Sequence, residues 1–312
     1  MKCLFLYNPQ SGKGKINKYV KFAEKELKEK FEAVDVACSE GPKDMEKKAK
    51  EACGKYDYLV FSGGDGSFNE VINGICREDK KPVLGYIPTG TVNDISRSCG
   101  IPRRVRRAIK NVKDGVAKKL DVMCVNGACF AEYEISAGAM TSCSYKAPRQ
   151  EKIALGKFAY ALEILRHNMK LADFPVTVEC GGTVYRTDCE FLVFINSRSI
   201  ASMPVNPKAV LNDGEVELLL IRQVEKPRWY HKFRAFFKIL HFFAFGYNGS
   251  KNSAHFIKLK GNSFTVKTSA DTVWNFDGEE GVRGDISVKV IKECIELIVP
   301  ERKAGTKRFE RR

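Results

Sequence analysis

The chain has 312 residues, which is enough for two domains and a substantial hydrophobic core. Its 53 lysines and arginines against 38 aspartates and glutamates give a formal net charge of +15, which favours nucleic acid, an anionic membrane or a polyanionic substrate as partner. The 11 cysteines without CxxC spacing indicate free thiols in a reducing compartment, and the 4 scattered histidines without an HExxH pair argue against a histidine-based zinc site.

The first third of the chain alternates strand and helix signals. It opens on a buried-strand pattern over residues 2–7, whose apolar run is too short for a signal peptide, so we expect a cytoplasmic protein. The expected order is strand 2–7, helix 16–27, strand 31–38, helix 43–53, strand 56–62, a helix after Gly66, strand 83–88 and helices after Thr91 and Arg104. This alternation predicts an α/β domain with a mostly parallel, doubly wound sheet, which binds ligands at the carboxyl ends of its strands.

The pattern changes near residue 120. Short strands then meet turn pairs, which predict hairpins and a larger, mainly antiparallel, sandwich-like β domain with inserted helices. The turn pairs are Asn126-Gly127, Gly181-Gly182 and Gly261-Asn262. Cys124 and Cys129 flank the first turn and are expected to face each other as small buried side chains, not as a disulfide. We therefore expect an α/β domain over 1–121, to which 297–312 returns, and a β-rich domain over 122–296.

Two helical segments interrupt the β pattern, over residues 153–171 and 228–247. The second carries an apolar stripe formed by Trp229, Phe233, Phe236, Leu240 and Phe243, and widened by Phe237, Phe242 and Phe245. Charged residues interrupt it, so it is not a membrane span. Two interpretations remain open: a helix docked against the core of the β domain, or an apolar surface that meets lipid.

A glycine-rich segment, GGDGSFNEVINGI (63–75), stands where a predicted strand ends and a helix begins. Glycines let the backbone approach a ligand closely, and the unsatisfied amides and positive dipole of a helix start attract phosphate. Asp65 would repel a phosphate unless a metal ion or a proton lay between them, which indicates a metal–phosphate site. The alternative is a structural helix start capped by Ser67 or Asp65.

Three further segments place polar residues near predicted strand ends. YNPQSGKGK (7–15) follows the first strand but fits neither the Walker A pattern nor GxGxxG. IPTGTVNDISR (87–97) and VWNFDGEEG (273–281) end later strands, so we expect one cleft built from many loops. Taken alone, Asp277-Gly278-Glu279 is also typical of a hairpin turn with exposed acids.

In combination, these segments resemble the soluble diacylglycerol kinase catalytic-domain family, which includes bacterial lipid kinases, sphingosine kinases and, more distantly, NAD kinases. The motifs NPQSG, GGDGSFNEVINGI, PTGTVNDISR, NPKAVLNDGEVEL and NFDGE occur in the family's order and approximate spacing, and the resemblance covers nearly the whole chain. GTVND together with NDGEVEL favours the lipid-kinase branch. Ser67 stands where the family usually has threonine, and it keeps the hydroxyl.

The resemblance implies a role for each matching position. Glu279 resembles the general base that takes the proton from a lipid hydroxyl, with Asp277 beside it holding metal or γ-phosphate and Asp65 serving Mg-ATP. The implied ATP-binding residues are Asn8, Pro9, Gln10, Ser11, Gly12, Ser39, Gly63, Gly64, Asp65, Gly66, Ser67, Phe68, Asn69 and Thr91. The implied second, structural magnesium site consists of Asp213 with backbone oxygens near Val210 and Glu215. The remaining cleft residues are Asn93, Asp94 and Arg97.

The implied function is ATP-dependent transfer of the γ-phosphoryl group to diacylglycerol or a related lipid alcohol in phospholipid metabolism, at the inner membrane surface. Clustered basic residues would hold such an enzyme on anionic lipid, at about 1 kcal/mol per residue near the surface. These basic residues are Arg103, Arg104, Arg106, Arg107 and the lysines and arginines of the tail, residues 301–312.

Other possibilities remain open at this stage. One is a kinase for a soluble acceptor such as NAD, and another is a nucleotide-binding or nucleic-acid-binding protein without turnover. No nucleic-acid recognition motif is present, so we expect no nucleic-acid partner, and a homodimer is left open. Arg198, Ala201, Ser202 and Met203 stand where relatives often have glycines, which leaves the lipid undecided among diacylglycerol, sphingoid and polyprenol.

Overall fold

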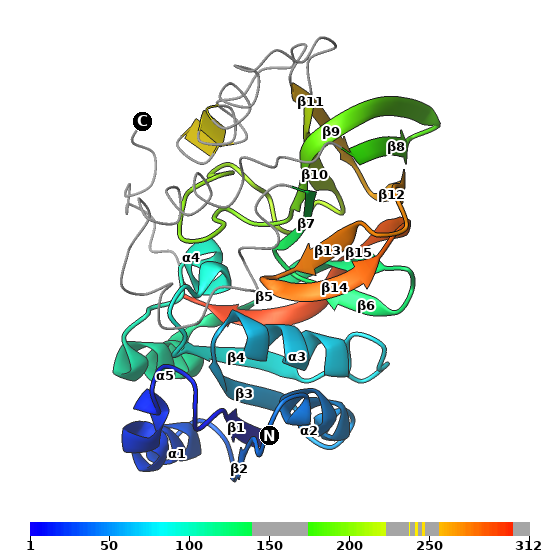
Figure 1. The fold of residues 1–312 in the computed structure, drawn as a ribbon. Helices are drawn as coiled ribbons and strands as arrows, with labels where there is room; N and C mark the ends of the chain where they lie inside the picture. Colours follow the sequence, from blue (N-terminus) through cyan, green and yellow to red (C-terminus); the bar gives the residue numbers. More distant parts are fainter. Residues whose placement is uncertain (139–173, 223–236, 238–240, 243–244, 247–255, 302–312) are drawn as a thin grey trace.

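The computed structural model describes residues 1–138, 174–222, 237, 241–242, 245–246 and 256–301 (Figure 1). Its N-terminal part is a parallel sheet in the order β4-β3-β1-β2. The elements in chain order are β1 (Lys2–Tyr7), the 3-10 helix η1 (Lys15–Tyr19), α1 (Val20–Lys28), β2 (Ala33–Cys38), α2 (Asp44–Ala52), β3 (Tyr58–Gly63), α3 (Asp65–Ile75), β4 (Val83–Pro88), α4 (Asp94–Cys99) and α5 (Val105–Asp114). The expected mostly parallel α/β sheet is confirmed.

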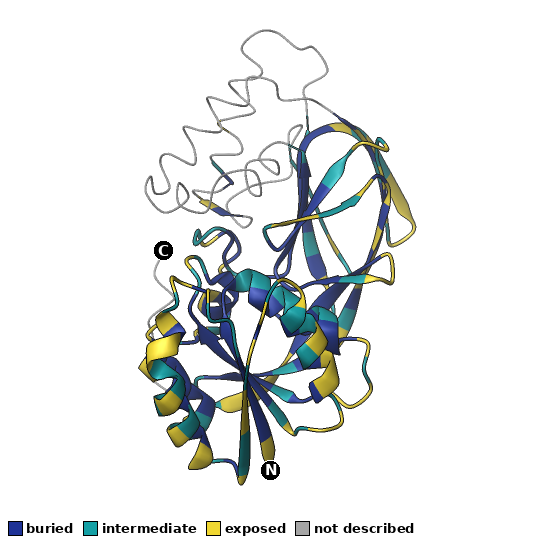
Figure 2. Ribbon diagram, turned by 60° about the horizontal axis from the view of Figure 1, so that its bottom comes forward, coloured by how far each residue is buried: buried dark blue, intermediate teal, exposed yellow. Residues whose placement is uncertain are grey.

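Helices cover both faces of this sheet, because successive strand side chains point to opposite sides. Leu6 and Phe61 pack in one hydrophobic cluster with Met45 of α2 and residues of α3. Phe5, the neighbour of Leu6 in β1, packs on the opposite face of the sheet, with Leu27 of α1 and residues of α5. Figure 2 shows the resulting pattern, with buried inner faces and exposed outer faces on the helices. The sheet is therefore doubly wound, as expected.

The C-terminal part is mainly antiparallel. Its strands are β5 (Val116–Val125), β6 (Cys129–Ala131), β7 (Glu134–Gly138), β8 (Phe174–Cys180), β9 (Thr183–Ile195), β10 (Val216–Arg222), β11 (Phe256–Gly261), β12 (Ser263–Lys267), β13 (Val273–Phe276), β14 (Glu279–Arg283) and β15 (Ile286–Val299). The backbone path through the sheet runs β14-β13-β7-β9-β8-β12-β15, while β10 pairs with β9 and β11. The larger antiparallel β region that the turn pairs predicted is present, packed around Trp274, Phe194 and Leu218.

The long strand β15 joins the two parts (Figure 1). It pairs antiparallel with β12 at its start and with β5 along most of its length. Near its end, Leu297 pairs in parallel with Leu84 of β4. The chain thus returns to the N-terminal sheet at residues 297–299 through backbone hydrogen bonds.

The predicted turns differ in outcome. Asn126-Gly127 and Gly181-Gly182 both have left-handed backbone angles and lie in hairpin turns, as their sequences predict; the first hairpin has three residues between its paired strands and the second has two. Gly261-Asn262 does not close a hairpin, because β11 pairs with β10 whereas β12 pairs with β8 and β15. The prediction that Cys124 and Cys129 face each other is also wrong, since Cys129 pairs with Val125 and Cys124 pairs with Phe130.

The predicted helix over 153–171 and most of the helix over 228–247 lie outside the described residues. In the described part of the second segment, Phe242 is fully buried against Phe191 of β9 and other residues of that sheet. Phe237 and Phe245 are 55% and 66% exposed. Within the described ranges, no helix has the length and apolarity needed to cross a bilayer.

Candidate active site

The loops that follow β1, β3 and β4 meet at the carboxyl ends of these strands. Asn8 N–H donates to the carbonyl of Ser62 (2.9 Å), and Thr89 N–H donates to the carbonyl of Gly63 (2.8 Å). A buried chain of hydroxyl groups continues the connection, with Thr89 Oγ1 lying 3.3 Å from Ser62 Oγ and 3.1 Å from Ser11 Oγ. Segments that the sequence singled out separately thus form one surface.

Glycine is needed where these loops touch. Gly12 has φ +58°, and a Cβ there would collide with the carbonyl oxygen of Thr89. Gly64 lies against Gly90, so that a Cβ on Gly90 would come 2.5 Å from the Gly64 Cα. Because neither residue has a side chain, the loops after β3 and β4 pack backbone to backbone beside the start of α3.

The first turn of α3 has no side-chain cap, which rules out the structural alternative for Ser67 and Asp65. Gly64 is the N-cap residue, and its carbonyl accepts the Phe68 N–H at 3.0 Å. Ser67 instead accepts a bond from the Asn8 side chain, at 3.3 Å. An uncapped helix start of this kind is suited to bind an anion.

Two carboxylates beside this helix start carry a polar atom without a partner. Asp65 Oδ2 accepts the Asn93 N–H (2.7 Å), and Asp94 Oδ1 accepts the Ser199 hydroxyl (2.8 Å). The second oxygens, Asp65 Oδ1 and Asp94 Oδ2, are buried and have no hydrogen-bond partner among the described residues. Burial, then repulsion from Asp94, raises the pKa of Asp65 to about 7, and burial also raises the pKa of Asp94.

The donor set of these two carboxylates fits magnesium. Mg²⁺ typically takes one or two carboxylate oxygens and completes its shell with water and substrate phosphate. Within the described ranges, no group of three or more histidine, cysteine, aspartate or glutamate side chains is arranged to hold a metal by itself. A bound phosphate would therefore have to supply further ligands here, which matches the uncapped start of α3.

Asp277 lies in the β13–β14 hairpin turn but is not an exposed acid, because it is only 3% accessible. Its carboxylate accepts the backbone N–H groups of Glu132, Tyr133 and Glu134 at 2.7–3.0 Å. It also accepts the Asn69 side-chain amide at 2.9 Å. Burial raises the pKa of Asp277, while these hydrogen bonds oppose the rise. Asp277 thus ties α3 to the segment between β6 and β7.

Glu279 lies on the far side of the same turn, as the first residue of β14, and its side chain is exposed. A Cβ built on Gly66 would lie 3.2 Å from Glu279 Oε1, so the carboxylate reaches the first turn of α3. The turn therefore buries Asp277 as an anchor and leaves Glu279 exposed beside the first turn of α3. Glu279 and Asp65, far apart in sequence, end on the same side of the molecule.

The other sequence-predicted residues differ in how they are held. Ser39 lies beside the end of β1, where its N–H donates to the Tyr7 carbonyl (2.9 Å), and Thr91 accepts Arg103 Nη2 on its carbonyl (2.8 Å). Phe68 is buried in the core and makes edge-to-face ring contacts with Phe61 and Tyr86, so its side chain is structural. The remaining predicted residues, Pro9, Gln10, Gly63 and Arg97, lie in or next to the three loops.

The segment that departs from the family pattern contacts Asp94. The Ser202 N–H donates to Asp94 Oδ1 at 2.9 Å, beside the Ser199 hydroxyl. Ala201 and Ser202 have φ values of 51° and 67°, which non-glycine residues seldom adopt. Asn196 donates to the carbonyls of Asp121 and Glu132. This segment of the β domain is thus held directly against Asp94 of α4.

Sequence reasoning missed three groups near the site. Glu132 and Glu134 are buried beside Asp277, and burial followed by repulsion from Asp277 raises the pKa of Glu134 to about 8. They stand in a strand-like pattern without any motif, so the sequence offered no signal for them. Arg103 was grouped with the basic cluster, yet it bonds Thr91, whereas Arg106 packs over the Tyr19 and Phe22 rings.

The second expected metal site does not form from the residues present. Asp213 and Glu215 lie just before β10, and Val210 in the same loop is 54% exposed. Lys260 Nζ lies 2.6 Å from Asp213 Oδ2 and 3.4 Å from Glu215 Oε2. The cation beside Asp213 is therefore an ammonium group, and this arrangement does not fit a magnesium ion.

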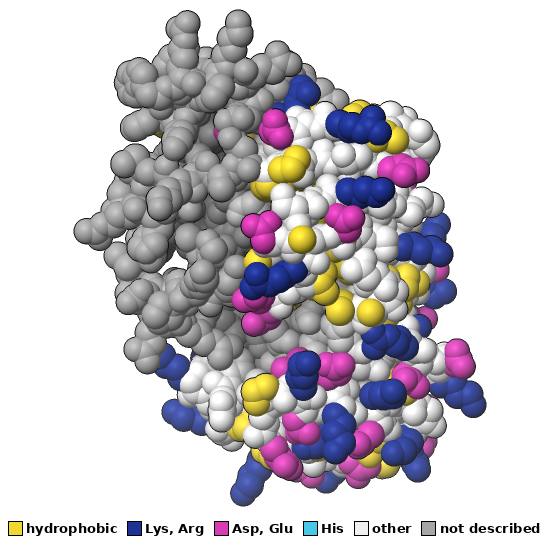
Figure 3. Space-filling view, turned by 45° about the vertical axis from the view of Figure 1, so that its right-hand side comes forward, with side chains coloured by type: hydrophobic (Ala, Val, Ile, Leu, Met, Phe, Trp, Pro, Cys, Tyr) yellow, Lys and Arg dark blue, Asp and Glu magenta, His cyan; other side chains and the backbone are white. Residues whose placement is uncertain are grey.

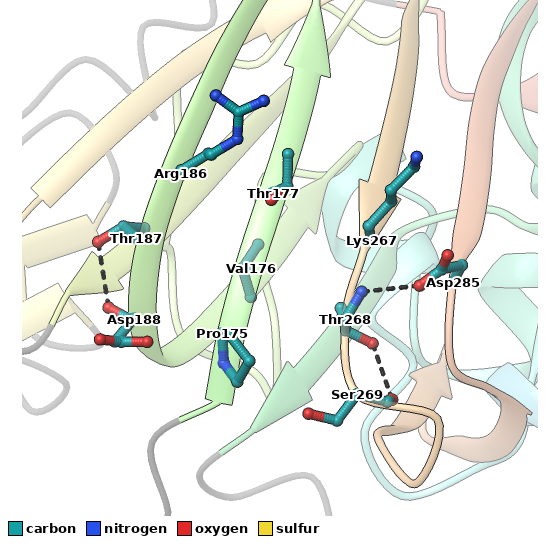
Figure 4. A pocket seen from close by; sticks show the side chains of 10 residues that line it. All are labelled: Pro175, Val176, Thr177, Arg186, Thr187, Asp188, Lys267, Thr268, Ser269 and Asp285. Carbon is teal, nitrogen blue, oxygen red and sulfur yellow. Dashed lines mark hydrogen bonds between the residues drawn. The ribbon is translucent and has the colours of Figure 1, made fainter.

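A pocket lies on the β domain, away from these loops (Figure 4). It is lined by residues of β8, β9 and β12 and their flanks, with Arg186 and Lys267 opposite Asp188 and Asp285. None of the sequence-predicted site residues lines it. Figure 3 shows a face with positive and negative side chains interspersed, without the single-sign stripe that a nucleic-acid-binding surface presents.

Comparisons with known proteins agree with this geometry. Residues 2–125 match the diacylglycerol kinase catalytic domain. The chain is 29% identical over 306 residues to a diacylglycerol kinase of Bacillus subtilis (strain 168), covering 96% of each chain. It is 27% identical over 298 residues to a diacylglycerol kinase of Staphylococcus epidermidis, covering 95% of this chain and 91% of that one. A crystal structure of a diacylglycerol kinase from Bacillus anthracis is similar in fold, with a TM-score of 0.77, 23% identity and 96% coverage of each chain.

Proposed function

We propose that this chain is a member of the diacylglycerol kinase catalytic-domain family, which its residues 2–125 match, and that it transfers the γ-phosphoryl group of ATP to the hydroxyl of diacylglycerol or a related lipid alcohol. The observation that carries the proposal is the pair of unpartnered oxygens on Asp65 and Asp94 beside the uncapped start of α3. Oxygen ligands next to free helix amides are what a metal–triphosphate complex requires.

Phosphoryl transfer asks little covalent work of a protein, so positioning and charge neutralisation carry most of the catalysis. The amides at the start of α3 and in the loops after β1 and β4 hold the phosphates, and Asp65 and Asp94 would hold Mg²⁺. When bound, the ion offsets negative charge that grows on the phosphate oxygens. The acceptor oxygen forms a bond to the γ-phosphorus while the bond to the leaving phosphate oxygen breaks, so that ADP departs.

Glu279 acts as the general base in this proposal. Its exposed carboxylate is close to Gly66, where the transferred phosphate would lie, and it accepts the proton of the lipid hydroxyl as that oxygen attacks. Asp277 holds the turn that presents Glu279, through its bonds to three backbone amides. We therefore assign Asp277 a positioning role.

A labelling assay tests the function. Purified protein with magnesium and γ-labelled ATP is incubated with mixed micelles containing diacylglycerol, ceramide, sphingosine or polyprenol, and at least one lipid becomes labelled. Glu279→Gln and Asp65→Asn each reduce turnover by about 100-fold or more, because the base or the metal ligand is lost.

The matched control is Glu280→Gln, which alters the exposed neighbour of Glu279 in an ion pair with Arg283 and keeps wild-type turnover. Full turnover of the Glu279→Gln variant would contradict the assignment of the base. Phosphorylation of NAD at the same rate with or without micelles would show that the acceptor is soluble.

We further propose that the protein works as a peripheral enzyme on anionic membrane at the cytosolic face. The exposed side chains of Phe237 and Phe245 support this, because exposed aromatic groups with basic neighbours suit insertion at a headgroup boundary. The lipid substrate would then enter the cleft from the membrane surface.

A further inference from the structure

Lys260 occupies the centre of a cluster of three acids. Its Nζ lies 2.6 Å from Asp213 Oδ2, 3.4 Å from Glu215 Oε2 and 3.9 Å from Glu217 Oε1. The ammonium group thus contacts the carboxylates of all three acids, and its shortest contact is the hydrogen bond to Asp213. The three acids follow one another with single-residue spacing, so one cation serves them all.

Strand pairing fixes this lysine where it stands. In the antiparallel ladder between β10 and β11, Lys260 is directly opposite Glu217, and opposite residues share one face of a sheet. The ammonium group is thus attached to a strand that is already hydrogen-bonded to the acidic segment. A cation held in this way does not dissociate.

Hydrogen bonds within the protein hold the loop before β10 in place. Asp213 Oδ1 accepts the Glu215 N–H (3.1 Å), so both oxygens of this carboxylate have partners. Asp121 accepts the Gly214 N–H at 2.6 Å and the Glu293 N–H at 2.7 Å, which ties the loop to the bulge in β15. These contacts supply the order that a structural metal ion would otherwise supply.

We propose that the ammonium group of Lys260 takes the place of the structural magnesium ion at Asp213, so that the junction of β10, β11 and β15 folds without a metal. Magnesium then acts in this protein only at the phosphate site by Asp65 and Asp94. The inference concerns stability, and its test uses no kinase assay, so it stands or falls independently of the proposed function.

The first test compares magnesium responses without nucleotide. The melting temperatures of wild-type protein and of Asp213→Asn are measured with and without millimolar magnesium at constant ionic strength. We expect magnesium to change the melting temperature of both proteins equally, because any such change arises from binding at Asp65 and Asp94. A magnesium response in the wild type that Asp213→Asn abolishes would overturn the proposal.

The second test asks whether stability comes to depend on magnesium once Lys260 is replaced. Lys260→Met leaves three neighbouring carboxylates without a cation, so its melting temperature falls and magnesium restores it by about 2 °C, a gain that Lys260→Met/Asp213→Asn loses. Lys260→Arg keeps the cation and gains no magnesium response. A Lys260→Met protein with the same magnesium response as wild type would count against the proposal.

The matched control is Lys289→Met on β15, an exposed strand lysine without an ion pair among the described residues. It leaves both the melting temperature and the magnesium response unchanged. If Lys260→Met does not fold, the comparison of wild type with Asp213→Asn still decides the question.

Discussion

At the scale of single residues, the site depends on acids whose environments differ sharply. Glu279 is exposed at the start of β14, whereas Asp65, Asp94, Glu134 and Asp277 are wholly or largely buried. Desolvation disfavours the charged form of a carboxyl group and mutual repulsion adds to it, so the buried acids bind protons more readily. Exposure alone therefore separates the proposed proton acceptor, Glu279, from the buried acids, to which we assign metal-binding or structural roles.

The buried acids predict how stability changes with pH. The pKa of Glu134 rises from its ordinary value of 4.5 to about 8 in the folded protein. Between these pH values Glu134 holds a proton in the folded state that it has lost in the unfolded state. The contribution of Glu134 to the free energy of unfolding therefore falls by about 1.4 kcal/mol for each unit by which the pH rises. We expect the free energy of unfolding in urea, measured without metal or nucleotide, to fall as pH rises from 5.5 to 7.5.

Glu134→Gln isolates this effect. The amide keeps an oxygen that can accept the Asn275 side chain, which donates to Glu134 Oε1 at 3.1 Å, but it does not titrate. The variant therefore loses part of the pH slope and gains stability relative to wild type as the pH increases. A wild-type slope that the substitution leaves unchanged would argue that Glu134 is charged in the folded protein.

At the scale of elements, strand ends and helix starts position the chemistry. The sharp turns from β3 into α3 and from β4 towards α4 are possible because Gly64 and Gly90 lack side chains where the two loops touch. The β13–β14 hairpin positions polar groups from the β domain. Its turn buries Asp277 and leaves Glu279 exposed. Each element contributes one or two polar groups, and these groups converge at the start of α3.

The sequence left two interpretations open for the segment around Phe242: docking against the β-domain core, or an apolar surface that meets lipid. Its described residues have features of both. Phe242 is buried in the β-domain core, while Phe237 and Phe245 are exposed. We predict that Phe245→Ser weakens association with anionic vesicles in a sedimentation assay by about 5-fold, because one exposed aromatic side chain no longer enters the interface.

A control separates lipid contact from general surface polarity. Val184→Ser removes another exposed apolar side chain, 44% accessible, from the hairpin between β8 and β9. We expect it to leave vesicle binding unchanged. Equal binding of wild type and Phe245→Ser, or equal binding to neutral and anionic vesicles, would contradict membrane docking by this segment.

At the scale of the whole molecule, several connections hold the domains together in the described part of the chain. One is the pairing of β15 with β5 and β4. A second is the Asp277 carboxylate with its bonds to Asn69 and residues 132–134, and a third is Asp94 with its bonds to Ser199 and Ser202. The second connection lies in the turn that leads to Glu279. Geometry at Glu279 therefore depends on how the domains meet.

Asp277→Asn tests this connection. The asparagine amide would direct N–H donors at backbone N–H groups, so we expect a loss of about 2 kcal/mol in the free energy of unfolding in urea. Asp271→Asn, in the exposed turn before β13, serves as control and leaves stability unchanged. Wild-type stability of Asp277→Asn would mean that the carboxylate is not needed as an acceptor.

The sequence by itself determined the parallel α/β sheet, the antiparallel β region and the hairpins at Asn126-Gly127 and Gly181-Gly182, because hydrophobic periodicity and left-handed turn residues are local properties. It also identified the loops that converge at α3. It failed at Gly261-Asn262, where strand partners distant in the chain decide the pairing and a turn pair carries no information about them.

The environment of each acid, by contrast, is visible only in the folded structure. Burial and hydrogen-bond partners separate the anchored Asp277 from the exposed Glu279 and leave Asp65 and Asp94 with a free oxygen each. The pairing of β10 with β11 brings Lys260 to Asp213 across 47 residues of chain. The physical reason is that desolvation and charge pairing depend on neighbours in space, which a linear motif does not specify.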